Sequence, residues 1–246
     1  MDDVAAADQP TSLLLPGQAG RQASQDGREA QGSQRSPGPL RLGGREFAPG
    51  RALVMAIVNR TPDSFYKPGL TWDEGAALER VHAAVAEGAD ILDVGGVPAK
   101  PGPEVTAAEE IRRVVPFIER VRAAYPDLVI SADTWRHEPA RIVIDPAHDF
   151  GKNTWHSLEI TRRLAELAAT GWPVLVSLSN KDFVGETLDA PLDERVAGTL
   201  ATTAVSAWLG ARVFRVHQVR ETRHVLRMVS AIRGDTPPAL AVRGLA

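Results

Sequence analysis

One stretch limits the fold of this chain more than any other: six apolar residues in a row at positions 53–58, followed at once by polar residues. An apolar run of this length is typical of a β-strand buried on both faces of a sheet. Asn59 ends the run, and the Thr-Pro-Asp-Ser sequence at 61–64 predicts a turn. In α/β barrels and open parallel sheets, ligands bind just after strands of this kind.

The segment from residue 51 to residue 246 alternates between strand and helix patterns. Strands are expected at 53–58, 90–94, 128–132, 141–144, 173–178 and 211–216, and helices at 71–88, 106–125, 156–171, 191–210 and 219–233. Such alternation predicts parallel strands joined by right-handed crossovers. In the second helix, Thr106 and Glu109 form a predicted capping box. Its expected buried stripe is Ile111, Val114, Val115, Ile118 and Val121.

The connection between the third and fourth predicted strands is too short for this pattern. It contains about eight residues, one of them Pro139, whereas a parallel crossover needs about a dozen, usually with a helix. An eight-unit barrel also takes about 250 residues, or roughly 31 per unit. We therefore expect an α/β fold with about six β/α units, either an open sheet or an incomplete TIM (β/α)8 barrel.

Composition sets the outer limits of function. Residues 1–50 are rich in Gly, Gln, Ser and Pro and predict a disordered N-terminal tail, which leaves one domain at 51–246. The absence of cysteine excludes disulfides and thiolate metal sites. A net charge of −3 and the lack of a long apolar run predict a cytoplasmic protein that binds neither nucleic acid nor membrane.

Polar side chains stand at the end of the predicted strands, and in a parallel α/β fold these ends meet on one face. They are Asn59, Asp133, Asp145, Lys152, Lys181, Arg215 and His217, together with the Gly95–Gly96 turn. Carboxylates accept hydrogen bonds from an N–H-rich ring, cations suit a diphosphate, and an amide oxygen can ligate a hard metal ion. The set predicts a pocket for a donor-rich ring and a phosphate ester.

Each of these residues also has a simpler explanation. Asp133 could cap a helix, Asp145 before a proline could form a turn, and Lys152 could lie on the surface. His217 could be a partly buried structural histidine. Structural or solvated positions are the simpler explanation for His148, His156 and His224. The joint pattern is more informative than any single member.

Six motifs in order carry a resemblance to a known family: VNRTPDSF, ILDVGG followed by KPG, ISADTW, VIDPAHDFGKN, LSNKD and FRVH. From about residue 53 to the C-terminus, the chain resembles dihydropteroate synthase, the pterin-binding enzyme of folate synthesis. The wording of the first, fourth and fifth motifs is most similar to a divergent actinobacterial paralogue class in which catalysis is in question.

The resemblance implies an eight-stranded β/α barrel that works as a homodimer. The implied reaction joins p-aminobenzoate to a dihydropterin methyl diphosphate and releases diphosphate, with Mg²⁺ as cofactor and without a side-chain nucleophile. The implied roles are Mg²⁺ and diphosphate contact for Asn59, pterin binding for Asp133 and Asp145 with Lys181 beside them, and diphosphate binding for Arg215 and His217.

The chain departs from the family pattern in ways that bear on activity. Arg60 replaces the usual valine, Ala99 and Lys100 replace a threonine and an arginine, and Asn180 replaces an arginine. The family's fourth and fifth strands and their helices are absent at the short connection. Their loss would expose two sheet edges, and we expect marginal stability, aggregation or partner-dependent folding.

Three hypotheses remain open from the sequence alone. The first is an enzyme of the dihydropteroate synthase type. The second is a catalytically inactive homologue that binds a ligand or a partner, or a degenerate product. The third is an open-sheet binding protein unrelated to folate.

Overall fold

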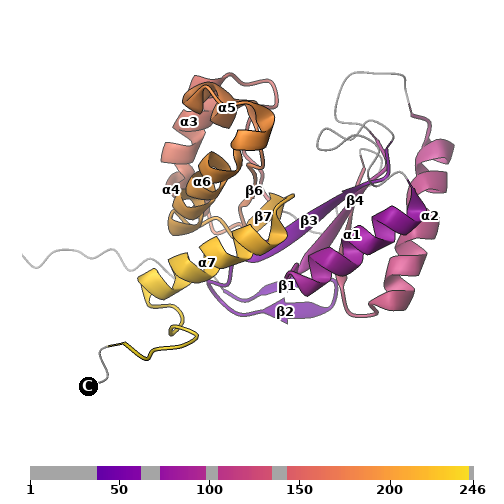
Figure 1. Ribbon diagram of the computed structural model, residues 1–246, viewed down its shortest axis with the longest axis horizontal. Coiled ribbons are helices and arrows are strands. Elements are labelled where there is room, and N and C mark those ends of the chain that lie inside the picture. The colour runs from indigo at the N-terminus through magenta and orange to yellow at the C-terminus, as the bar shows by residue number, and fades with distance from the viewer. Residues whose placement is uncertain (1–37, 62–72, 98–104, 135–142, 244–246) are drawn as a thin grey trace, which may run out of the picture. The chain divides into compact units, whose positions relative to one another are not determined.

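The computed structural model describes residues 38–61, 73–97, 105–134 and 143–243 of the chain (Figure 1). The predicted turn at 62–64, the helix cap proposed for Thr71, and the departures at Ala99 and Lys100 lie outside these residues.

Five parallel strands form the main sheet, in the order β5-β4-β3-β7-β6. They are β3 (Leu53–Asn59), β4 (Ile91–Gly95), β5 (Val129–Asp133), β6 (Leu175–Ser177) and β7 (Val213–Val216). The first and last of them, β3 and β7, pair with each other in parallel, Leu53 opposite Val213. Pairing of the first strand with the last is how a β/α barrel closes on itself. The expected α/β fold of incomplete barrel type is confirmed.

The two ends of this sheet lie on either side of the connection between the third and fourth predicted strands, which is too short for a helical crossover. At one end, β5 pairs only with β4 among the described strands. At the other end, Ile144 makes a single parallel bridge to Val174, next to β6. The strand expected at 141–144 is therefore reduced to one bridge in the described residues, and the described sheet has five strands instead of six.

A β-hairpin precedes the sheet, in the segment for which a disordered tail was predicted. It consists of β1 (Leu40–Leu42) and β2 (Arg45–Phe47). Leu40 and Phe47 are buried in a cluster with residues of β3, β4, β5 and β7. The tail boundary at residue 50 is wrong in this respect. Each hairpin strand supplies a single buried side chain, which is too little apolar pattern to detect in the sequence.

Seven α-helices and one short 3₁₀ helix connect and cover the described strands. They are α1 (Glu74–Ala86), α2 (Ala107–Ala124), α3 (Thr154–Arg162), α4 (Leu164–Ala168), α5 (Asp182–Leu188), α6 (Val196–Trp208) and α7 (Val219–Arg233), with η1 at Leu192–Glu194. The helix expected at 156–171 is divided into α3 and α4. The one expected at 191–210 is η1 followed by α6, and α5 was not expected.

Helix α2 begins as predicted, because the Thr106 hydroxyl accepts a hydrogen bond from the Glu109 N–H at 3.2 Å. Its buried face, however, is rotated from the predicted stripe. Val114 and Val121 are buried as expected, whereas Ile111 and Val115 are 57% and 44% exposed. The buried Phe117, which the predicted stripe did not include, completes the face.

The main core lies between the sheet and the helices that cover it, and Figure 1 shows α1 and α2 running alongside β3 and β4. Among the described residues, no helix has both the length and the apolar character needed to span a bilayer.

Candidate functional site

Alternation along the strands sorts side chains onto two faces, since successive residues of a strand point to opposite sides. One face of each strand begins with apolar residues of the hairpin cluster: Leu53, Met55, Ile91, Val129 and Val213. The next positions on that face are polar in three of these four strands. They are Asp93, Ser131 and Arg215, with the apolar Ile57 on β3, followed at the carboxyl ends of the strands by Asn59, Gly95, Asp133 and His217.

Arg215 lies between two carboxylates of this inner face. Its Nε donates to Asp93 Oδ2 at 2.7 Å, and its Nη2 donates to Asp133 Oδ2 at 3.1 Å. Burial opposes the charge on Arg215, but the two carboxylates outweigh it and raise the pKa of the guanidinium. Desolvation raises the pKa of Asp133, with the negative charge of Asp93 adding to the effect and Arg215 opposing it. The structure thus brings two predicted site residues into direct contact.

Asn59 stands in the same row of the sheet as Asp133, with Gly95 between them in register. A Cβ atom at Gly95 would lie 3.3 Å from Asn59 Oδ1 and 3.8 Å from Asp133 Oδ2. The missing side chain therefore leaves the space between an amide oxygen and a carboxylate open. This open space is a steric reason for glycine at position 95, in the predicted Gly95–Gly96 turn.

Asp145 and Lys181 share one electrostatic neighbourhood with Arg215. Desolvation raises the pKa of Asp145, and the charges of Lys181 and Arg215 oppose that shift. Desolvation likewise lowers the pKa of Lys181, with Asp145 opposing. The turn interpretation of Asp145 also holds, because its Oδ1 accepts a hydrogen bond from the Ala147 N–H at 2.8 Å.

The ammonium groups of the two lysines are held by the 147–150 loop. Lys181 Nζ donates to the His148 carbonyl at 3.1 Å and lies 3.9 Å from the centre of the Phe150 ring. Lys152 Nζ donates to the carbonyls of Ala147 and Phe150 at 3.1 and 3.2 Å. Lys152 therefore braces the loop, which agrees with its simpler interpretation as a residue outside the pocket.

His217 is neutral near pH 7. Burial, together with the smaller effects of the charges of Arg215 and Arg80, lowers its pKa to about 4. Its backbone is fixed at both ends, because its N–H donates to Ser179 Oγ at 3.2 Å and its carbonyl accepts from Arg80 Nη2 at 2.7 Å. An anion at this position would meet a hydrogen-bonding imidazole, with the positive charge supplied by Arg215.

Sequence reasoning missed two carboxylates of this region. Asp93 is buried inside β4, and Asp149 accepts from Ser157 Oγ at 2.9 Å and from the Phe183 N–H at 3.2 Å. Asp93 had a usable signal, because a charged residue within an apolar strand needs a partner. Asp149 had none, since an aspartate in a Gly- and Pro-rich loop is commonplace.

Two departures from the family pattern, Arg60 and Asn180, can be located in the structure. The Arg60 guanidinium carbon lies 5.0 Å from the centre of the Phe117 ring, and its Nη1 donates to the Asp73 carbonyl at 3.3 Å, so the side chain lies among α1 and α2. Asn180 is 1% exposed with a φ of 55°. Its amide group has no hydrogen-bond partner among the described residues. Arg60 is therefore directed toward the helices, and Asn180 is enclosed by the protein.

The described part of the chain contains no cluster of three or more His, Asp or Glu side chains that could hold a metal ion by itself. Asn59 offers one hard oxygen ligand beside the inner face, while Asp93 and Asp133 are engaged by Arg215. The donor set therefore suits Mg²⁺ only if a bound ligand supplies further oxygens.

Comparison with known proteins identifies the family that the chain matches. A family model described as "Pterin binding enzyme" matches residues 55–141 and 137–217. The two matched segments overlap at 137–141. These positions belong to the short connection that follows β5, the strand at one end of the described sheet.

Curated relatives include the "Inactive dihydropteroate synthase 2" of Mycobacterium tuberculosis, which is 44% identical over 287 residues, covering 83% of this chain and 90% of the relative. Since 83% of 246 residues is about 204, roughly 80 of the aligned positions have no residue of this chain. The dihydropteroate synthase of Escherichia coli is 27% identical over 269 residues, covering 75% of this chain and 95% of the relative.

Solved structures agree with the fold. The Yersinia pestis dihydropteroate synthase with a sulfonamide drug complex has a TM-score of 0.73 at 26% identity, covering 80% of this chain and all of that chain. The Xanthomonas albilineans dihydropteroate synthase with 4-aminobenzoic acid has a TM-score of 0.71 at 29% identity, covering 84% of this chain and all of the other.

Proposed function

The chain belongs to the pterin-binding enzyme family, and we propose that it retains part of the family's ligand site and binds a pterin diphosphate without effective synthase activity. The observation that carries the proposal is the short connection around residues 137–141, which we call the joint. The family model matches on both sides of residues 137–141, and the alignment with the M. tuberculosis relative contains about 80 positions without a residue of this chain, which we assign to this connection. A ligand could still contact residues that precede the short connection and residues that follow it. The part of the pocket that the fourth and fifth β/α units form in the family would be missing.

In this proposal each retained residue keeps a binding role. Asp133 and Asp145 would accept hydrogen bonds from the pterin ring, with Lys181 beside it. The Arg215 guanidinium would leave Asp133 for the diphosphate while Asp93 continues to hold its Nε. His217 would donate a hydrogen bond to the same group. Asn59 would help to hold Mg²⁺, which would offset the negative charge of the diphosphate.

The relatives' names support the non-catalytic interpretation at the level of the family. The M. tuberculosis relative is named inactive, at 44% identity. In this chain the position of a family arginine holds the buried Asn180, whose short side chain stays within the protein. A site without that arginine would bind p-aminobenzoate weakly.

Isothermal titration of the full chain with a dihydropterin diphosphate analogue, with and without Mg²⁺, tests the binding role. We expect saturable binding that weakens at least tenfold without Mg²⁺ and in Asp133→Asn and Asp145→Asn. Asp127→Asn, at an exposed residue before β5, is the matched control and should bind as the wild type does. A folded chain that binds no pterin compound would refute the proposed function.

Synthase activity is the second candidate, because the ligand residues named above are retained. A turnover assay with p-aminobenzoate separates the two. Turnover at a rate near that of a competent synthase would overturn the non-catalytic proposal, while binding without turnover would support it.

We also propose a homodimer in the cytoplasm. Helices α6 and α7 pack together, and each leaves large apolar side chains exposed. They are Val205, Trp208, Met228 and Ile232, which are 49%, 56%, 61% and 61% exposed. Clustered apolar exposure of this kind is typical of an interface. Light scattering of the wild type and of Trp208→Glu measures the oligomeric state, and cell fractionation tests the location.

A further inference from the structure

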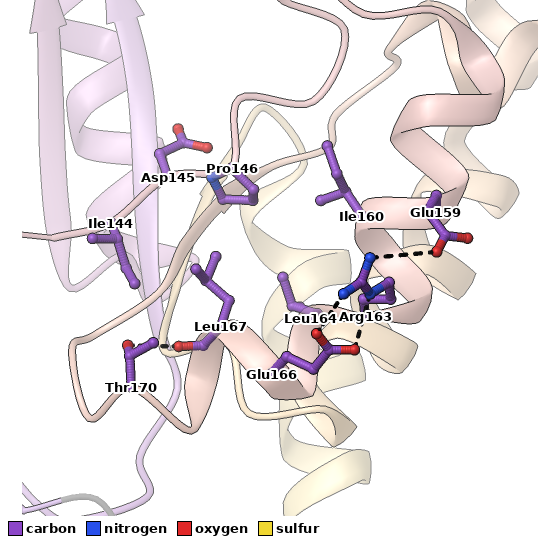
Figure 2. A pocket seen from close by; sticks show the side chains of 10 residues that line it. All are labelled: Ile144, Asp145, Pro146, Glu159, Ile160, Arg163, Leu164, Glu166, Leu167 and Thr170. Carbon is purple, nitrogen blue, oxygen red and sulfur yellow. Dashed lines mark hydrogen bonds and ion pairs between the residues drawn. The ribbon is translucent and has the colours of Figure 1, made fainter.

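The side of the molecule where the sheet is open carries an apolar groove. The groove has a volume of about 460 Å³ and lies between the Ile144–Pro146 segment and helices α3 and α4 (Figure 2). Its apolar lining consists of Ile144, Pro146, Ile160, Leu164 and Leu167. Three of its four charged lining residues already compensate one another, because Arg163 lies 2.8 Å from Glu166 and 4.0 Å from Glu159. The fourth, Asp145, accepts a hydrogen bond from the Ala147 N–H. The groove is therefore suited to apolar side chains more than to a charged ligand.

Beside this groove, Ile144 forms its one described bridge, to Val174 on the β6 side. Ile144 donates its N–H to the Pro173 carbonyl at 3.0 Å and accepts from the Leu175 N–H at 2.9 Å. In an extended strand, the neighbouring residues direct their backbone groups to the other side. Val143 and Asp145 thus present theirs away from β6, and within the described residues no backbone partner meets them there. Among the described residues, this position therefore offers backbone donors and acceptors to an incoming strand.

The opposite end of the sheet offers the same combination of strand edge and apolar helix flank. Strand β5 pairs with β4 alone among the described strands. On α2, a rotation of about 100° per residue places Ile111 and Val115 on the flank opposite Arg120. Arg120 faces α1, since its Nη1 lies 2.8 Å from Glu74 Oε1. The exposed pair Ile111 and Val115 therefore faces away from α1, beyond the last described strand.

The alignment with the relative indicates how long a polypeptide would be needed to connect these two ends of the sheet. About 80 positions of the alignment have no residue of this chain, and we assign them to the connection where the two family matches meet. One barrel unit takes roughly 31 residues. A piece with two consecutive β/α units would pair one strand with β5 and another with the Ile144 edge. Its amphipathic helices would cover the flank of α2 and fill the groove beside α3 and α4.

We propose that the open side is a docking surface for a separate polypeptide consisting of two consecutive β/α units of the pterin-binding family. The unpaired strand edges at both ends, each with an apolar helix flank, define this partner and disfavour a single isolated helix or a flat surface. The proposal does not depend on pterin binding by the chain.

The test is titration of the full chain with the roughly 80-residue segment of the M. tuberculosis relative that aligns with the gap. We expect a one-to-one complex by light scattering and calorimetry, with an affinity that changes little with salt because the rim charges are already paired. Ile160→Glu in the groove and Ile111→Glu on α2 should each weaken binding at least tenfold. Ile111 is 57% exposed, so its variant keeps the fold.

Ile232→Glu is the matched control, because Ile232 is similarly exposed on α7, outside the groove and the α2 flank. It should leave the affinity for the segment unchanged even if it alters dimerisation of the chain. Absence of binding, or an equal loss in all three variants, would overturn the proposal. Self-association that Ile111→Glu and Ile160→Glu abolish, and with which the added segment does not compete, would show instead that a second copy occupies the surface.

Discussion

Strands β3 and β5 both begin with apolar residues, but the apolar run is six residues long at β3 and three at β5, and the two strands lie in different environments. All residues of β3 from Leu53 to Val58 are buried, and the strand has a neighbour on each side. In β5 only Val129 is buried, and exposure increases toward Asp133. Burial of a strand is therefore set by its neighbours as well as by its sequence, and the family's site is divided between a closed side and an open side of the same sheet.

The two ion pairs of Arg215 should show the largest difference in stability between the closed and the open side of the sheet. The Asp93 side chain is 4% exposed and the Asp133 side chain 51% exposed, although both bind the same guanidinium. Asp93→Asn should lower the free energy of unfolding by about 4 kcal/mol, because it breaks a buried pair. Asp133→Asn should cost less than about 1 kcal/mol. Urea unfolding measures both, and equal losses would show that the open side is as well covered as the closed side.

Core truncation should follow the same division. Leu92 on β4 is 1% exposed and belongs to the main core, whereas Ile130 on β5 is only partly buried. We expect Leu92→Ala to cost about 3 kcal/mol and Ile130→Ala about 1 kcal/mol, since a fully enclosed site loses contacts and leaves a cavity. Thermal and urea melts of the two variants check the difference. A larger loss in Ile130→Ala would mean that β5 is covered in solution.

Acid should weaken a packed segment that lies close to the open edge. His148 is 1% exposed, and burial lowers its pKa to about 4. The unfolded chain, with an ordinary pKa near 6.5, then binds the proton first as the pH falls. The free energy of unfolding should decrease from about pH 6.5 down to about pH 4, by roughly 3 kcal/mol for this group.

His148→Gln isolates this contribution. His217 has a similarly lowered pKa and remains in the variant, so the variant should keep about half of the acid slope. Unfolding measured at several pH values between 4 and 7 gives both slopes. Identical slopes in the two proteins would show that His148 is not buried in solution.

Much of the fold was accessible from the sequence because apolar runs and caps are local. The central strands and α7 follow the predicted spans, and Thr106 caps α2 as expected. The exposure of Ile111 and Val115 was not predictable in this way. Their spacing suits a buried stripe, but among the described residues no neighbour covers them, and the sequence of the helix does not show this.

The site was predictable to a similar extent. Residues at the strand ends were found because parallel strands gather their ends on one face. The Arg215–Asp133 pair and the role of Asp93 were not found, since they depend on register between strands far apart in the chain. Register is fixed by packing in three dimensions, and a single sequence leaves it open.

The smallest predicted effect concerns the flank of α2 and tests whether its apolar exposure matters to the isolated chain. Ile111→Ser should change the free energy of unfolding by no more than about 0.5 kcal/mol, because the side chain is largely in solvent already. Phe117→Leu, on the buried face of the same helix, is the control and should cost more than 1 kcal/mol. The serine variant should also aggregate more slowly on heating, since it removes apolar surface next to an unpaired strand edge. If Ile111→Ser instead destabilises the chain as much as Phe117→Leu, the α2 flank is covered in solution, and the contrast between the open and closed sides of the sheet does not hold.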